Sequence, residues 1–167
     1  MQIDKKYKAP DYTQIGHVHL KVSDLNRSLE FYQGLLGFEL TMNYGDQAAF
    51  LSAGGYHHHI GLNTWHSLNS PRAQKDGVGL YHTAFLYPSR KDLARIFDQI
   101  RRASYPLSGA SDHGVSEALY LNDPDGNGVE LYWDRPKELW PTNNDGSLTM
   151  FTRPLDLDNL LTELDAK

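Results

Sequence analysis

The sequence predicts an α+β fold that contains the same β-α-β-β-β module twice. Polar and apolar residues alternate over residues 15–22 and again over residues 80–87, which is the pattern of a half-buried strand. Each of these strands is followed by a helix N-cap and by apolar residues at helical spacing. A length of 167 residues suits one domain or two closely joined halves.

The first module is expected over residues 15–64. The apolar residues of its first strand share one face, and His17 and His19 share the opposite face. Ser23 and Asp24 supply an N-cap for the helix that follows, and Gly37 ends that helix. Three short strands are expected after it, near residues 38–42, 48–53 and 57–63.

The second module is expected over residues 79–133. Its helix begins after Ser89, and it is followed by strands near residues 117–121 and 129–133. The sequence DPDGNG at 123–128 predicts a turn between these two strands. His82 lies on the first strand of this module, at the place that His17 occupies in the first module.

Residues 15–133 are therefore expected to form one domain, flanked by two extensions. Residues 1–14 are polar and form an N-terminal extension. Residues 134–167 form a C-terminal extension that reads as a loop followed by a short amphipathic helix, because its leucines cluster between Leu155 and Leu164. The simplest role for that helix is to cover apolar surface.

Composition excludes several function classes. Sixteen basic against 21 acidic side chains give a net charge of −5 with no basic block, which argues against nucleic-acid binding. The absence of cysteine excludes disulfides, thiolate metal sites and cysteine nucleophiles. No apolar run is long enough for a membrane span. The polar N-terminus predicts no secretory signal, which favours a cytoplasmic location.

Two histidines and one carboxylate form a candidate metal-ligand set. His17 and His82 stand at matching positions, and Glu130 lies within a strand, where a carboxylate is costly to bury without a partner. Two imidazoles and one carboxylate suit non-haem Fe(II), and the same donors can hold Mn(II), Ni(II) or Zn(II). On spacing alone, a structural role for these histidines stays open beside the metal site.

The internal run of residues 57–59 adds three more imidazoles. If it continues a strand, His58 faces opposite to His57 and His59, and the pattern does not decide which of them faces a site. His19 shares a face with His17, so it either lines the site or stays partly exposed. No nucleophile elbow, Walker loop or dinucleotide fingerprint is present.

Specific motifs resemble the vicinal oxygen chelate superfamily. Residues 16–25 (GHVHLKVSDL), with FY at 31–32 and LGF at 36–38, resemble its opening, and residues 123–131 (DPDGNGVEL) resemble its closing ligand strand. The superfamily includes glyoxalase I, fosfomycin-resistance proteins, bleomycin-binding proteins and extradiol dioxygenases. The resemblance implies paired βαβββ modules that form a curved mixed sheet around one metal.

Two further segments narrow the resemblance to the catechol 2,3-dioxygenase branch. They are residues 54–63 (GGYHHHIGLN) and 116–120 (SEALY). The residues that this branch implies as metal ligands are His17, His82 and Glu130, and those that it implies as catalytic are His58, His113 and Tyr120.

That branch implies an Fe(II)-dependent extradiol dioxygenase that opens a catechol-like aromatic diol with O2, as in the catabolism of aromatic compounds. Many such enzymes have four modules, whereas this chain has two. One-domain forms tend to associate, so a homo-oligomer is expected.

Two other function classes stay open. The first is a non-oxidative metal-dependent lyase, isomerase or transferase of the same superfamily. Its activity would need no O2 and would be unchanged in His58→Ala. A metal-free small-molecule binding protein predicts binding that survives Glu130→Ala. The position of glyoxalase I's fourth ligand is Ile60 here, which cannot bind a metal and counts against a glyoxalase.

Overall fold

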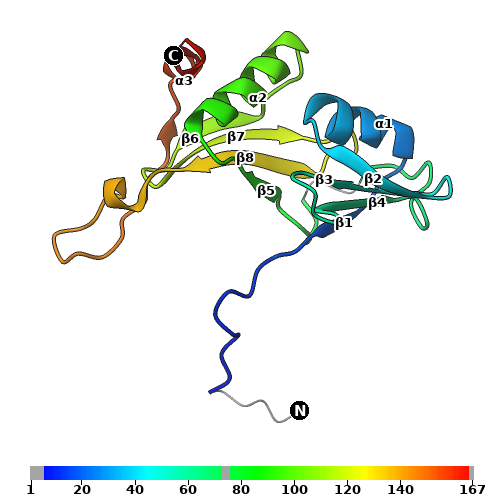
Figure 1. Ribbon diagram of the computed structural model, residues 1–167, viewed down its shortest axis with the longest axis horizontal. Helices are drawn as coiled ribbons and strands as arrows, with labels where there is room; N and C mark the ends of the chain where they lie inside the picture. The colour runs from blue at the N-terminus through cyan, green and yellow to red at the C-terminus, as the bar shows by residue number, and fades with distance from the viewer. Residues whose placement is uncertain (1–5, 73–75, 166–167) are drawn as a thin grey trace.

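The chain folds into two β-sheets that lie side by side, with the principal helices on one side of them (Figure 1). The computed structural model describes residues 6–72 and 76–165. The predicted α+β fold with two βαβββ modules is confirmed, although the expected curved sheet is divided into a four-stranded and a five-stranded sheet. Each sheet belongs mainly to one module.

The first module forms the four-stranded sheet, in the order β1-β4-β3-β2. Strands β1 and β4 are parallel, and the other neighbours are antiparallel. Its elements are β1 (Val18–Lys21), α1 (Leu25–Leu29), a π-helical segment η1 (Glu30–Leu35), β2 (Glu39–Tyr44), β3 (Ala48–Ser52) and β4 (Ile60–Asn63). The Asp24 carboxylate accepts a hydrogen bond from the Arg27 amide, as expected of an N-cap.

The second module repeats this arrangement in the five-stranded sheet, in the order β5-β8-β7-β6-β9. Strand β5 is parallel to β8. Its elements are β5 (Thr83–Leu86), α2 (Arg90–Arg102), β6 (Gly109–Asp112), β7 (Ser116–Asn122) and β8 (Gly128–Asp134), and β9 (Arg153–Pro154) extends the sheet. Helix α2 begins directly after Ser89, as expected, and the Ser89 side chain caps it.

Two local differences from the expected elements bear on the site. Strand β6 has the sequence GASD, which carries no apolar alternation, so its position comes from pairing with β7 and β9. Strand β4 begins only at Ile60, so residues 57–59 precede it. The expectation of a strand through His57 and His58 is therefore wrong, and a turn at Gly54 and Gly55, both with positive φ, leads into this segment instead.

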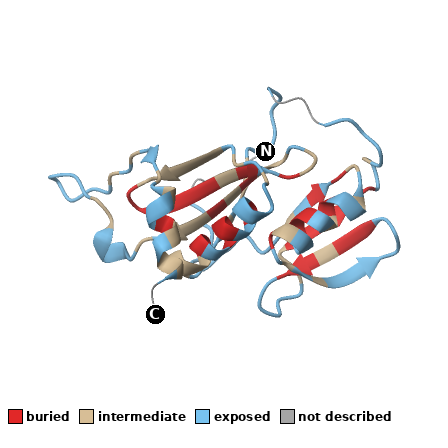
Figure 2. Ribbon diagram, turned by 90° about the horizontal axis from the view of Figure 1, so that it is seen from above, coloured by how far each residue is buried: buried red, intermediate tan, exposed pale blue. Residues whose placement is uncertain are grey.

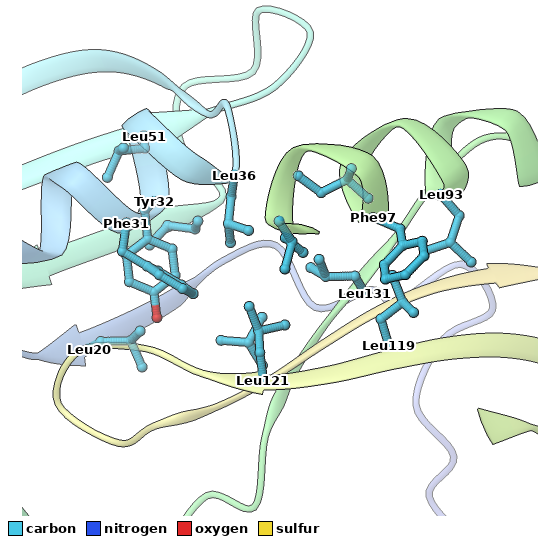
Figure 3. Close-up of a cluster of buried hydrophobic side chains, with 14 of the residues drawn as sticks. Leu20, Phe31, Tyr32, Leu36, Leu51, Leu93, Phe97, Leu119, Leu121 and Leu131 are labelled. Atoms are coloured by element: carbon cyan, nitrogen blue, oxygen red, sulfur yellow. The ribbon is translucent and has the colours of Figure 1, made fainter. Parts of the chain in front are cut away.

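One hydrophobic core joins the two modules. Buried residues cluster where the helices meet the sheets (Figure 2), and the cluster contains side chains of both modules, such as Leu20, Tyr32 and Leu121 (Figure 3). Across the boundary, the rings of Phe38 and Phe85 lie 5.0 Å apart between centroids. Burial of a shared apolar surface therefore holds the modules side by side.

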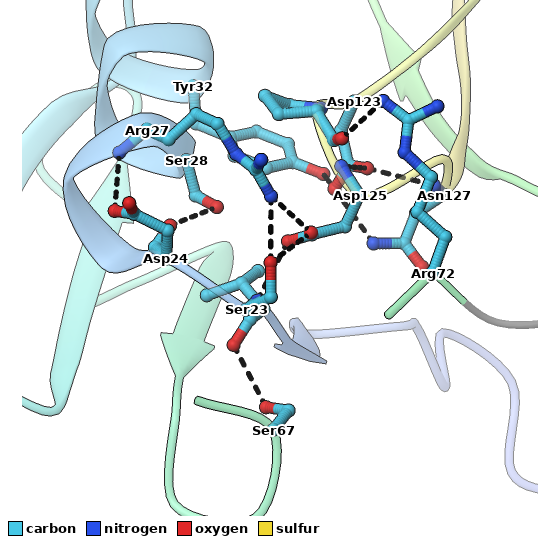
Figure 4. A network of polar contacts seen from close by, with 12 residues as sticks. Ser23, Asp24, Arg27, Ser28, Tyr32, Ser67, Arg72, Asp123, Asp125 and Asn127 are labelled. Atoms are coloured by element: carbon cyan, nitrogen blue, oxygen red, sulfur yellow. Dashed lines mark hydrogen bonds and ion pairs between the residues drawn. The ribbon is translucent and has the colours of Figure 1, made fainter. Parts of the chain in front are cut away.

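Polar contacts reinforce this boundary next to the core (Figure 4). The buried Tyr32 hydroxyl donates to the Asp123 carboxylate at 3.0 Å. The Asp125 carboxylate accepts from the Ser23 amide at 2.9 Å and from the Arg27 guanidinium at 2.6 Å. The turn between β7 and β8 is thus bonded to the start of α1 in the other module.

The C-terminal segment packs on the second module. It contains a 3-10 turn η2 (Lys137–Leu139), strand β9, helix α3 (Leu157–Leu161) and a second 3-10 turn η3 (Thr162–Leu164). Leu160 is fully buried, and Arg90 of α2 bonds to Glu163 and Asn159. Within residues 6–72 and 76–165, no helix is both long and apolar enough to span a membrane.

Candidate functional site

The side of the second sheet that faces away from the helices carries four of the predicted site residues. Val129 and Leu131 of β8 are buried in the core, so Glu130 between them points to the opposite face. Glu130 pairs with Tyr120 of β7 on one side and with Ala84 of β5 on the other. Paired residues share a face, so the strand alternation places these side chains together.

His82 contacts Glu130 directly. His82 immediately precedes β5, and its Nε2 lies 2.9 Å from Glu130 Oε2. The two side chains are 31% and 14% exposed, so the pair is reachable from outside but partly screened from water. A β-carbon added at Gly128 would lie 2.3 Å from the Tyr81 carbonyl oxygen and 3.0 Å from His82 Cβ. The absence of a side chain at Gly128 therefore allows the close approach of the segment that carries His82.

Tyr120 and His113 continue the chain of contacts. The Tyr120 hydroxyl donates to Glu130 Oε1 at 2.9 Å, and His113 Nε2 lies 2.8 Å from the same hydroxyl. His113 Nδ1 lies 3.1 Å from the carbonyl oxygen of Phe151. A carbonyl only accepts, so the proton of a neutral His113 ring resides on Nδ1 and leaves Nε2 as an acceptor. The single Tyr120 proton thus has two acceptors.

Burial, followed by the hydrogen bond to Glu130 and the charge of that carboxylate, raises the pKa of Tyr120 above its usual value. The phenol therefore stays protonated at neutral pH and acts as a hydrogen-bond donor. The Phe151 carbonyl is a contributor that the sequence did not predict, because it lies in the C-terminal extension and acts through a backbone atom.

The first module holds a separate cluster of imidazoles. The rings of His17 and His58 lie 4.5 Å apart between centroids, and His57 Nδ1 lies 2.7 Å from His58 Nδ1. His57 and His58 thus contact each other instead of facing opposite sides of a strand. His59 lies apart from this contact, with its Nδ1 3.0 Å from the Ser52 hydroxyl.

His58 and His19 are both biased toward the neutral form. Burial, and then neighbouring imidazoles beginning with that of His17, lower the pKa of His58. The same two causes lower the pKa of His19, whose ring lies near those of Phe50 and Trp65. Gly61 lies against the His19 ring, where an added β-carbon would be 2.8 Å from it. Neutral imidazoles retain the lone pair that accepts a proton or binds a metal.

The structure therefore brings together His82 and Glu130 but places His17 in the other cluster. Among residues 6–72 and 76–165, no group of three or more histidine, aspartate and glutamate side chains is close enough to hold a metal ion. The donor set still fits a divalent cation, because His82 Nε2 and Glu130 Oε2 are both metal-binding atoms and lie in contact. A cavity of about 410 Å³ lies elsewhere, beside Ser23 and Leu25 at the start of α1.

Comparison with known proteins places the chain in a family. The model of the Glyoxalase/Bleomycin resistance protein/Dioxygenase superfamily matches residues 14–131. The chain belongs to this superfamily. The match ends one residue after Glu130, so it contains all six predicted site residues and leaves the C-terminal extension outside.

Curated relatives in the superfamily include two ring-diol dioxygenases. The chain is 38% identical to "Catechol-2,3-dioxygenase" of Bacillus subtilis over 155 residues, which is 90% of this chain and 52% of that protein. It is 33% identical to "Biphenyl-2,3-diol 1,2-dioxygenase 3" of Rhodococcus globerulus, over 72% of this chain and 63% of that one. The chain thus spans between half and two thirds of these relatives.

A shorter relative and a solved structure complete the comparison. "Metallothiol transferase FosB" of Staphylococcus epidermidis is 27% identical over 73% of this chain and 82% of its own. A glyoxalase/dioxygenase from Nostoc punctiforme superposes with a TM-score of 0.65 at 18% identity, covering 81% of this chain and all of that one. At that identity, the superposition supports the superfamily fold and nothing narrower.

Proposed function

We propose that this protein is an extradiol dioxygenase that opens a catechol-like aromatic diol with O2. The observation that carries the proposal is the continuous chain of contacts from His82 through Glu130 and Tyr120 to His113. It joins two metal-binding atoms to a phenol and an imidazole suited to proton transfer. The identity to two diol dioxygenases supports this choice within the superfamily.

The metal of the proposed site would be held by His82 and Glu130, which are in contact, and by His17, which lies beside His58 in this structure. Fe(II), when bound there, supplies the coordination of diol and O2 and the electron transfer between them, which protein side chains alone do not provide. The single carboxylate among these ligands leaves net positive charge on the site, which favours an anionic diol oxygen. His82 Nε2 and Glu130 Oε2 lie 2.9 Å apart, so both donor atoms are positioned to bind one cation.

Tyr120 and His113 orient the diol and accept the proton that it loses. The protonated Tyr120 phenol donates a hydrogen bond to one diol oxygen, and His113 Nε2 accepts the proton that passes through Tyr120. The Phe151 carbonyl keeps the opposite nitrogen of His113 protonated, so the ring presents its acceptor toward Tyr120. The diol reaches the site from the sheet face that the helices leave open.

His58 is proposed as an acid–base group on the O2 side of the site. Its lowered pKa keeps it neutral at physiological pH, and its ring lies 4.5 Å from that of His17, the ligand proposed from the first module. A neutral imidazole accepts a proton at one step and returns it at another.

Oxygen consumption tests the proposed function. Protein is loaded anaerobically with Fe(II) and then given catechol and substituted catechols, with uptake recorded beside the absorbance of a yellow ring-opened product. Uptake matched by product, and lost in His82→Ala and Glu130→Ala, is the expected result. His66→Ala is the matched control because His66 is exposed and outside both clusters. Metal-loaded protein that consumes no O2 with these diols would contradict the proposal.

The similarity to a metallothiol transferase supports a second candidate, a non-oxidative metal-dependent transferase. It predicts turnover with Mn(II) or Ni(II) under nitrogen, and no loss in His58→Ala. Turnover without O2 would replace the dioxygenase proposal with this one.

A further inference from the structure

We propose that Arg135 is a positioning residue that holds the His113 ring in place for proton transfer. Arg135 directly follows β8 and lies outside the residues that match the superfamily. The inference rests on the proposed function only in taking His113 as the group that accepts a proton. It goes further by naming the side chain that fixes the backbone from which this ring projects.

The first argument is the place of His113 in the fold. His113 lies in the short connection between β6 and β7, directly after Asp112, the last residue of β6, which pairs with Glu117. Strand β6 carries no apolar side chain larger than that of Ala110, so burial of apolar surface contributes little to fixing its end. The position of His113 therefore depends on polar contacts around this connection.

The second argument is that the Arg135 guanidinium binds both sides of this connection. Its Nη1 donates to Asp112 Oδ1 at 2.6 Å and to the Gly114 carbonyl oxygen at 3.1 Å, which are the two neighbours of His113 in the chain. Its Nη2 donates to Glu117 Oε1 at 2.7 Å, on the opposite strand. A planar guanidinium makes these bonds at once because its N–H groups diverge in a fixed fork, whereas an ammonium group is a single point of charge.

The third argument is that the partners of Arg135 are themselves held firmly. The Glu117 side chain is only 6% exposed, and its second oxygen accepts a hydrogen bond from Arg90 Nε of α2 at 2.8 Å. Burial opposes the charged form of Asp112, but hydrogen bonds from Arg135 and from the Gly114 amide outweigh it and lower the pKa of this carboxyl. Removing the guanidinium would leave a buried carboxylate with one cation fewer, which is costly.

The backbone that Arg135 fixes decides which atoms the His113 ring reaches. Nε2 lies 2.8 Å from the Tyr120 hydroxyl, whereas Nδ1 lies 3.1 Å from the Phe151 carbonyl oxygen and 3.3 Å from the Thr152 hydroxyl. A shift of about 1 Å in the backbone would break the contact with Tyr120, because hydrogen bonds weaken steeply with distance and angle. A rigid support behind the ring is therefore part of its function in the proposed proton transfer.

Nuclear magnetic resonance of the His113 ring nitrogens tests the positioning without any need for turnover. The full chain is labelled with 15N, Zn(II) is added as a diamagnetic ion, and the His113 signal is identified by its loss in His113→Gln. In wild type we expect one form, with the proton on Nδ1 and with Nε2 as an acceptor. In Arg135→Lys we expect both nitrogen shifts to move toward the average of the two tautomers. Arg95→Lys, at an exposed arginine that pairs with Asp92, is the control and should keep the wild-type shifts.

Kinetics of the Fe(II)-loaded protein with catechol test whether Arg135 acts through His113. We expect Arg135→Lys to lower kcat by roughly 10-fold or more and to leave KM within about 2-fold of wild type, because the substitution displaces a proton acceptor and no binding group. In a His113→Gln background the same substitution should cause no further loss. An equal loss of kcat in both backgrounds would mean that Arg135 supports only the fold, and it would overturn the inference.

The two measurements separate this inference from the proposed function. A displaced His113 signal in Arg135→Lys, in a protein that consumes no O2 with diols, supports the positioning of His113 by Arg135 and refutes the dioxygenase. O2 uptake by wild type together with wild-type His113 shifts in Arg135→Lys supports the dioxygenase and refutes the positioning. Circular dichroism checks that each variant is folded. If Arg135→Lys does not fold, Asp112→Asn decides in the same way, because it keeps the size of the side chain and removes one charge that Arg135 binds.

Discussion

The Tyr120 hydroxyl donates a hydrogen bond to the Glu130 carboxylate across 2.9 Å, from the neighbouring position on the adjacent strand. The contact spans the β7–β8 ladder, so two rigid strands set its geometry. It leaves Glu130 Oε2 for His82, and His113 Nε2, 2.8 Å from the same hydroxyl, is the alternative acceptor of the Tyr120 proton. One side chain therefore couples the half of the site proposed to bind a metal to the half proposed to accept a proton.

Replacing Tyr120 with phenylalanine should slow catalysis without removing the metal. The ring still packs, but the diol loses a donor and the route to His113, so we expect kcat/KM for catechol to fall by roughly 10²-fold. Steady-state O2 uptake and metal content measure the two effects. Tyr44→Phe, on the exposed edge strand β2, is the control and should leave both unchanged. Unchanged kcat/KM in Tyr120→Phe would remove this residue from the mechanism.

Gly128→Ala should weaken metal binding through His82. The added methyl group would collide with the Tyr81 carbonyl oxygen at 2.3 Å, so the segment bearing His82 must shift away from Glu130. We expect a loss of about 1–3 kcal/mol in unfolding free energy and weaker Mn(II) binding in a titration. Gly34→Ala is the control, since nothing lies within 4 Å of its added carbon. Equal Mn(II) affinity in both variants would contradict the role of this close approach.

Gly114→Ala should displace the C-terminal extension from His113. Gly114 has φ +80°, and an added carbon would lie 2.7 Å from the Phe151 ring and 2.8 Å from Pro141. The matched control is Gly146→Ala, which has the same φ and open space around it. We expect Gly114→Ala to lose about 1–3 kcal/mol more stability than the control in urea unfolding.

The same pair of variants tests the orientation of His113. If the Phe151 carbonyl holds the ring, kcat should fall in Gly114→Ala, with a changed pH profile and unchanged metal content. If Gly114→Ala has the same kcat and pH profile as Gly146→Ala, the C-terminal extension supports the fold without acting on His113.

Tyr32→Phe should loosen the boundary between the modules. Its hydroxyl is buried and donates to the Asp123 carboxylate, so its removal leaves a buried charge with one donor fewer. We expect the unfolding free energy to fall by about 1.5–3 kcal/mol in urea denaturation. Tyr7→Phe, which is exposed, should change it by less than about 0.5 kcal/mol. Equal stability of the two variants would mean that this bond adds little to the boundary.

Stability should decline in alkaline solution because of buried tyrosines. Burial, followed by the Asp92 carboxylate, raises the pKa of Tyr87 to about 12. In the unfolded chain this phenol ionises near pH 10, so above about pH 10 the unfolded state binds fewer protons and is stabilised relative to the native state. The contribution is fully present below that pH. Urea unfolding at about pH 8 and about pH 10.5 measures the loss, which should be smaller in Tyr87→Phe than in wild type.

Much of this protein could be predicted from local sequence patterns. Alternation places Glu130 opposite the core residues Val129 and Leu131, and the structure has it there, because a strand has a fixed period of two. N-caps at Asp24 and Ser89 are likewise local, since the capping oxygen and its amide lie within three residues. Strand β6 and the start of β4 were not predictable in this way, because pairing with other strands decides them.

The sequence by itself determined the two βαβββ modules, their family, and the residue types available for a site. Only the tertiary structure decided which of these residues meet. Glu130 contacts His82 and Tyr120 because parallel and antiparallel ladders bring β5, β8 and β7 into register, whereas His17 lies with His58 because a shared core holds the modules side by side. Contacts between residues far apart in the chain depend on the packing of whole elements, and no local pattern encodes that packing.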